Sequence, residues 1–140
     1  MANMLTKLAA AYFDTKGIKY DLRGDNEEAI VTGFRLDNKE SQRIVVVFYP
    51  EENESCSIKV YEVVKVPKEK IGDVLIALNH LNNQFRWIKF SLDEEDLTVN
   101  AADDCVLTPE TCGEEVYRCC MQMVSIIDEA YPTIMKAMWG

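Results

Sequence analysis

The amino-acid sequence predicts an α+β fold, a mostly antiparallel sheet with helices packed on one face, in the order α-β-β-β-β-α-β-β-α. Three segments carry apolar residues at three- and four-residue intervals, which is typical of helices, and the segments between them alternate apolar and polar residues, which is typical of strands. Short polar turns separate most of the alternating segments, and such turns join antiparallel neighbours. We expect a single domain over residues 1–140, because the chain contains no linker or repeat.

The first half of the chain predicts one helix followed by a meander of strands. The helix is expected over residues 4–13, and Gly17 should end it, since glycine enters the left-handed conformation after a helix without steric cost. The third alternating segment is apolar on both faces, which favours a central strand, and Pro50 should close it. The four strands are expected at 18–22, 30–36, 44–49 and 56–66.

The middle of the chain predicts a second helix and a hairpin. Pro67 suits the first position of a helix, and the apolar stripe of that helix continues to Leu81. Two short alternating segments follow at 88–92 and 97–101, and the acidic residues 93–96 should form the turn between them.

The last element predicts a long amphipathic helix with a broad apolar face. Thr108-Pro109-Glu110 should open it, and Pro132 should kink or end it near Tyr131. Core packing is the default interpretation of the stripe, but a face rich in methionine is also typical of adaptable protein-binding surfaces. As an interface with a partner or second subunit, it would contain Val116, Cys120, Met123, Ile127, Tyr131, Ile134 and Met138.

The charge of the chain limits its partners. The formal net charge is −9 at pH 7, and phosphates or an anionic membrane surface repel a protein of this sign. Neither a nucleic acid nor a membrane is therefore an expected partner. The N-terminal residues lack the pattern of a targeting segment, and no stretch approaches the ~20 apolar residues of a membrane span. We expect a cytoplasmic protein.

The five cysteines are the first candidates for chemistry. No C-x2-C pair is present, although Cys112 and Cys119 lie seven residues apart and share a face of the last helix. Small buried apolar side chains are the favoured interpretation, and a redox or metal role is the alternative. The remaining three are Cys56, Cys105 and Cys120.

The other polar candidates also lack the spacing that catalysis or ligation requires. The lone histidine, His80, is expected near a helix end, where a cation is favourable, and no nucleophile motif accompanies it. The acidic segments 51–54, 93–96 and Asp103-Asp104 lack the spacing of a calcium loop and are interpreted as solvated turns. The glycines never cluster into a phosphate-binding loop. We therefore predict no catalytic residue, no cofactor and no metal, and the protein is expected not to be an enzyme.

The segment 78–96 resembles the core pattern LN-x-LN-x-x-x-RW-x-KF-x-LD of YbjN-type proteins, which are sometimes described as bacterial sensory transduction regulators. The matching residues are Leu78-Asn79, Leu81-Asn82, Arg86-Trp87, Lys89-Phe90 and Leu92-Asp93. The order of elements also resembles that family over almost the entire chain. The resemblance implies a fold like that of type III secretion chaperones, and it supplies no catalytic residues.

Two classes of function remain open from the sequence. The first is a non-enzymatic protein-binding module, chaperone-like or regulatory, that forms a homodimer and holds an extended segment of a partner protein at a sheet edge or on the last helix. The alternative is a small-molecule sensor or an enzyme with its site between the sheet and the helices.

Overall fold

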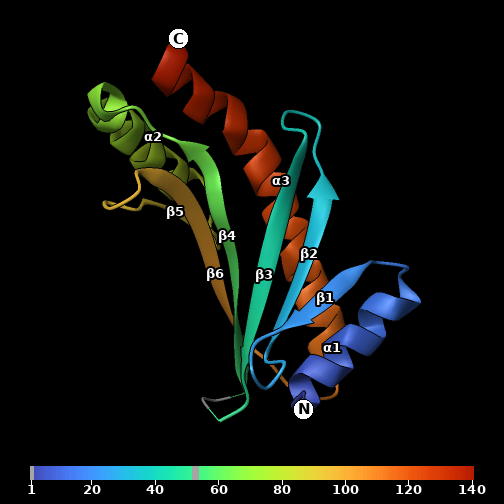
Figure 1. Cartoon of the computed structure of the whole chain (residues 1–140). Coiled ribbons are helices and arrows are strands. Elements are labelled where there is room, and N and C mark those ends of the chain that lie inside the picture. Colours follow the sequence, from blue (N-terminus) through green and yellow to red (C-terminus); the bar gives the residue numbers. More distant parts are fainter. Residues whose placement is uncertain (1, 52–53) are drawn as a thin grey trace.

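The computed structural model describes residues 2–51 and 54–140, which form one six-stranded antiparallel sheet and three α-helices (Figure 1). The strand order is β1-β2-β3-β4-β6-β5, so the first four strands form the predicted meander and β6 joins the hairpin to β4. The element order and the antiparallel sheet of the predicted fold class are confirmed. The strands are β1 (Tyr20–Arg23), β2 (Ala29–Arg35), β3 (Ser41–Tyr49), β4 (Ser55–Lys65), β5 (Lys89–Leu92) and β6 (Thr98–Val106).

The helices cover one face of this sheet. Along β3, Ile44, Val46 and Phe48 are buried among the helices, while Val45 on the other face is only partly buried and Arg43 is exposed. This alternation follows from the two-residue period of a strand, which sends successive side chains to opposite faces. The central position predicted for this strand is confirmed, since β3 lies between β2 and β4.

The longest helix, α3 (Cys112–Trp139), runs along the sheet, and the two shorter helices pack against it (Figure 1). Helix α1 (Met4–Thr15) ends before Gly17, whose φ of +69° is the left-handed conformation predicted there. Helix α2 (Ile71–Gln84) follows a short 3-10 turn and contacts both α3 and β5.

The helix boundaries differ from the prediction at three prolines. Pro67 has extended backbone and precedes the 3-10 turn, so α2 begins at Ile71 instead. Pro109 lies in a turn before α3, which begins at Cys112. Helix α3 continues through Pro132 to Trp139, because buried side chains on both sides of the proline hold the helix against the rest of the chain.

Two strands also differ from the prediction, β4 in its regularity and β6 in its length. β4 contains an irregularity between Val60 and Val64, where Glu62 adopts a φ of +54° and its N–H donates to Asn100 Oδ1 at 2.9 Å. β6 continues to Val106 rather than ending at Ala101. Of the acidic turn expected at 51–54, residues 52 and 53 lie outside the described residues.

Candidate functional site

Within the described residues, one end of β6 is unpaired on one side and borders a groove. The short strand β5 pairs only with Val99 to Ala102 of β6. The next four residues, Asp103–Val106, pair with β4 on one side, and no strand of the described chain pairs with them on the other. We call this stretch the β6 edge. Unpaired strand edges present backbone donors and acceptors that can hydrogen-bond to another chain.

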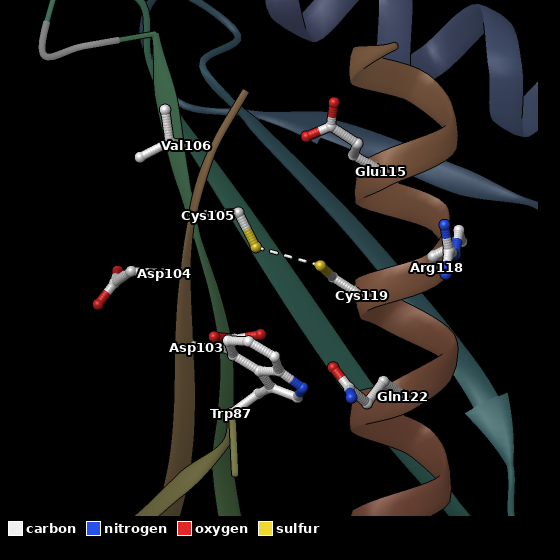
Figure 2. A pocket seen from close by; sticks show the side chains of 9 residues that line it. All are labelled: Trp87, Asp103, Asp104, Cys105, Val106, Glu115, Arg118, Cys119 and Gln122. Atoms are coloured by element: carbon white, nitrogen blue, oxygen red, sulfur yellow. Dashed lines mark hydrogen bonds between the residues drawn. The ribbon is translucent and has the colours of Figure 1, made fainter. Parts of the chain in front are cut away.

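A groove of about 550 Å³ lies between the β6 edge and α3 (Figure 2). Its walls are residues 103–106 of β6, Trp87 before β5, and four side chains of α3, namely Glu115, Arg118, Cys119 and Gln122. We call this space the β6–α3 groove. Acidic side chains outnumber the one cation, Arg118, along its walls.

Two thiols meet in this groove. The Sγ atoms of Cys105 on β6 and Cys119 on α3 are 3.1 Å apart, and both residues are partly exposed (Figure 2). The hydrogen bond with Cys119 lowers the pKa of the Cys105 thiol, but the contact with Cys56 and burial outweigh it and raise that pKa to about 12. The hydrogen bond with Cys105 and burial raise the pKa of the Cys119 thiol as well. Both thiols therefore stay protonated at neutral pH, which makes them weak nucleophiles.

The other cysteines are buried, in agreement with the favoured interpretation of small apolar side chains. They are Cys56, Cys112 and Cys120. The sequence placed Cys112 and Cys119 on one helix face, but the Cys112 thiol donates to the carbonyl oxygen of Leu5, 3.6 Å away, while Cys119 contacts β6. The pairing of Cys105 with Cys119 was missed, and only the continued alternation of Ala101, Asp103 and Cys105 could have indicated it.

The side chain of Asp103 lies on the helix-covered face of the sheet. It pairs with Ile58 across β4 and β6 and is only 9% exposed, which corrects the interpretation of Asp103-Asp104 as a solvated turn. Burial raises the pKa of this carboxyl, although a hydrogen bond from the backbone of Asp104 opposes the shift. The ion pairs of the described residues, Arg23–Asp21 and Lys70–Asp73, do not include Asp103.

We expect Asp103→Asn to raise the free energy of unfolding at pH 7 in metal-free protein. Because the pKa of Asp103 is higher in the folded than in the unfolded chain, the folded state binds more protons between the two values, and stability falls as pH rises through that window. The gain in stability from Asp103→Asn should therefore shrink as pH falls toward the pKa of Asp103 in the unfolded chain. Urea unfolding of both proteins between pH 3 and 8 measures it. Asp25→Asn, at an exposed aspartate far from Asp103 in the sequence, is the control, and an Asp103→Asn variant less stable than wild type at pH 7 would contradict the prediction.

Six of the seven residues proposed as an interface lie in the chain's own core. Val116, Cys120, Met123, Ile127, Ile134 and Met138 are at most 2% exposed, and Tyr131 is partly buried. The sheet and the two shorter helices cover these six side chains, as the core-packing interpretation predicts, and their role in an interface stays a prediction.

The conspicuous segment 78–96 has a structural role around β5. The Asn82 side chain accepts from the backbone N–H of Phe90 at 2.7 Å and donates to the carbonyl of the same residue at 3.0 Å. Lys89 Nζ donates to the backbone oxygens of Asn82 and Phe85 at the end of α2, where a cation is favourable. The Asp93 carboxylate accepts from two backbone N–H groups of the predicted turn. His80 is exposed on α2 and does not line the groove.

The fold and the groove define a class of small α+β proteins with an antiparallel sheet covered by helices on one face and an unpaired strand edge beside the last helix. The chain belongs to the YbjN family, whose model matches residues 8–136 and is described as "Putative bacterial sensory transduction regulator". The recognition of this family from segment 78–96 is confirmed.

A solved structure supports the same fold. The chain is similar to the structure titled "Crystal structure of YbjN, a putative transcription regulator from E. coli", with 14% sequence identity, 91% of each chain covered and a TM-score of 0.63. At this identity the likeness establishes the fold alone. No curated protein matches the sequence. No helix among the described residues is long and apolar enough to cross a membrane. The likeness to type III secretion chaperones stays a prediction.

Proposed function

We propose that this protein is a non-enzymatic regulator that binds an extended segment of a partner protein along the β6 edge. The observation that carries the proposal is the unpaired stretch Asp103–Val106, which faces a groove rather than a neighbouring strand. An extended peptide can add to such an edge as a further strand, with main-chain hydrogen bonds for affinity and side-chain pockets for specificity.

Apolar side chains flank the edge at both ends of the groove. Trp87 is 56% exposed and Val106 is 74% exposed, so both side chains are accessible to a segment bound in the groove. Tryptophan is among the residues most often found to dominate binding energy at protein interfaces. Trp87 therefore suits an anchor for an apolar side chain of the bound segment.

The charge of the groove selects the kind of segment. Asp104 and Glu115 line it together with Arg118, and the whole chain carries a net charge of −9. Complementary charge favours encounter with a basic segment and disfavours an acidic one. The expected ligand is thus an extended peptide that combines apolar with basic side chains.

The raised thiol pKa values support a binding role over nucleophilic catalysis. A catalytic cysteine needs a thiolate and usually a neighbouring base, whereas Cys105 and Cys119 are held as thiols. The homodimer predicted from the sequence would need another surface. Two copies that paired through the β6 edge would bring Asp103 and Asp104 of both copies into one short strand pair, and that concentration of negative charge disfavours this pairing.

We expect Trp87→Ala to weaken binding of basic, apolar extended peptides by about 30-fold or more, the effect of losing an interface residue that contributes ~2 kcal/mol. The probe is a set of peptides selected by the wild-type protein from a random library, with affinities measured by fluorescence anisotropy. Trp139→Ala is the matched control, since Trp139 is 65% exposed at the end of α3 and does not line the groove.

Two results would contradict the proposal. The first is that the wild-type protein selects no peptide from the library. The second is that the Trp87→Ala and Trp139→Ala variants bind the selected peptides equally well. Thermal unfolding of each variant shows whether a loss of affinity reflects a loss of structure.

A further inference from the structure

We propose that Asp103, Cys105 and Cys119 form a binding site for one zinc-like divalent cation. A carboxylate oxygen of Asp103 and the two Sγ atoms all lie within 4.8 Å of one another, and they come from two different elements, β6 and α3 (Figure 2). This inference goes beyond peptide binding and does not depend on it.

The separations suit a tetrahedral ion. Zinc binds thiolate sulfur at about 2.3 Å and carboxylate oxygen at about 2.0–2.2 Å, so ligand atoms around one tetrahedral ion stand about 3.5–3.8 Å apart. The two sulfurs, now 3.1 Å apart, would separate by less than about 1 Å to reach this geometry. The same 3.1 Å is well beyond the ~2.05 Å of a disulfide bond.

Regular secondary structure holds the backbone of all three ligand residues. Cys105 lies within β6 and pairs with Cys56 on β4, and Cys119 lies in the second turn of a 28-residue helix. Asp103 is two residues before Cys105 and therefore points to the same face of the strand. The ligands are thus assembled by the fold itself, and binding requires little ordering of the chain.

The electrostatics of the site favour a cation. The Asp103 carboxyl is buried and has no ion pair among the described residues, and a buried charge without an opposite charge beside it is costly even when it accepts a hydrogen bond. Glu115 and Asp104 add negative charge along the same groove. A divalent ion would compensate this charge, whereas a reactive cysteine pair is usually found in an electropositive environment.

The donor atoms select the kind of metal. Thiolate sulfur is a soft ligand that suits zinc and other late transition metals, whereas magnesium and calcium prefer sites made only of oxygen. On binding, Zn²⁺ forms two metal–sulfur bonds, and the two thiol protons pass to the solvent. With three protein ligands, the fourth tetrahedral position is left for water or for a group of a bound partner.

The test is metal binding by tag-free, fully reduced, metal-stripped protein. We expect one Zn²⁺ per chain in competition with a chromophoric chelator, and a thiolate-to-metal charge-transfer absorption when Co²⁺ replaces zinc. Cys105→Ala and Cys119→Ala should each weaken Zn²⁺ binding by at least about 10- to 100-fold, since even residues that only support metal ligands have effects of this size. Cys112→Ala is the matched control, because Cys112 lies on the same helix but its thiol donates a hydrogen bond to the backbone oxygen of Leu5.

Asp103→Asn provides a second readout that a merely structural residue would not give. The Asp103→Asn variant should bind Zn²⁺ more weakly than wild type but keep the cobalt–thiolate absorption. The loss of affinity would not reflect a loss of structure, because the metal-free variant is expected to be more stable than wild type. Circular dichroism of each metal-free variant verifies that it is folded. The proposal is overturned if wild type binds Zn²⁺ no more tightly than the Cys105→Ala/Cys119→Ala double variant, or if Cys112→Ala weakens binding as much as the two ligand variants do.

Discussion

Replacing Ile127 with alanine is expected to lower the free energy of unfolding by about 2–5 kcal/mol, the usual cost of removing a large buried side chain and leaving a cavity. Ile127 is fully buried midway along α3, within the core cluster shared by the sheet and the helices. Urea unfolding followed by circular dichroism measures the change, which should appear as a lower midpoint with an unchanged slope.

Ile76→Ala is the matched control for this experiment, because it removes the same atoms from an isoleucine that is 72% exposed on α2. We expect that variant to stay within about 0.5 kcal/mol of wild type. Light scattering on both variants tests the interpretation of the stripe as an interface with a second subunit. If Ile127→Ala left stability unchanged but altered the solution mass, then Ile127 would contact a second subunit rather than the core.

Local patterns were sufficient for most of the fold. Helix and strand periods do not depend on distant contacts, so the meander, the hairpin and Gly17 at the end of α1 agree with the structure. The end of β6 was missed for an equally local reason. Asp103 and Asp104 are residues that strands disfavour, and only the pairing of this stretch with β4 keeps it extended.

The proline in α3 shows where local preference is overruled. Pro132 removes one hydrogen bond from a helix, at a cost of about 3 kcal/mol. Ala130 and Ile134 on either side of it are fully buried, so ending the helix there would expose side chains whose burial offsets that cost. A sequence pattern does not reveal how much free energy a helix gains by packing on a sheet.

The candidate site depends on contacts between distant parts of the chain. Cys105 and Cys119 meet only because α3 crosses the helix-covered face beside β6, and Asp103 joins them only because β6 extends past the end of β5. The width of the apolar stripe on α3 likewise did not reveal that α1 and α2 cover its flanks. Residues 14 or more positions apart are brought together by the topology, which a single sequence does not specify.

The close approach of α1 and α3 predicts opposite effects for one substitution at two glycines. A Cβ atom at Gly113 would lie 2.4 Å from Tyr12 Cβ and 3.2 Å from the backbone oxygen of Leu8, whereas a Cβ at Gly72 on α2 would meet nothing within 4 Å. Gly72→Ala is therefore expected to stabilise the protein by up to about 1 kcal/mol, through the better helix propensity of alanine.

Gly113→Ala is expected to destabilise the protein, because forcing α1 away from α3 costs about 1–3 kcal/mol and outweighs the same gain in propensity. Gly113→Val should cost more, since its two extra methyl groups meet the same wall. Thermal and urea unfolding of the three variants give the signs directly. If Gly113→Ala were as stable as Gly72→Ala, α1 would not lie so close to the start of α3. The packing that positions α3 beside the β6 edge would then differ from the one described.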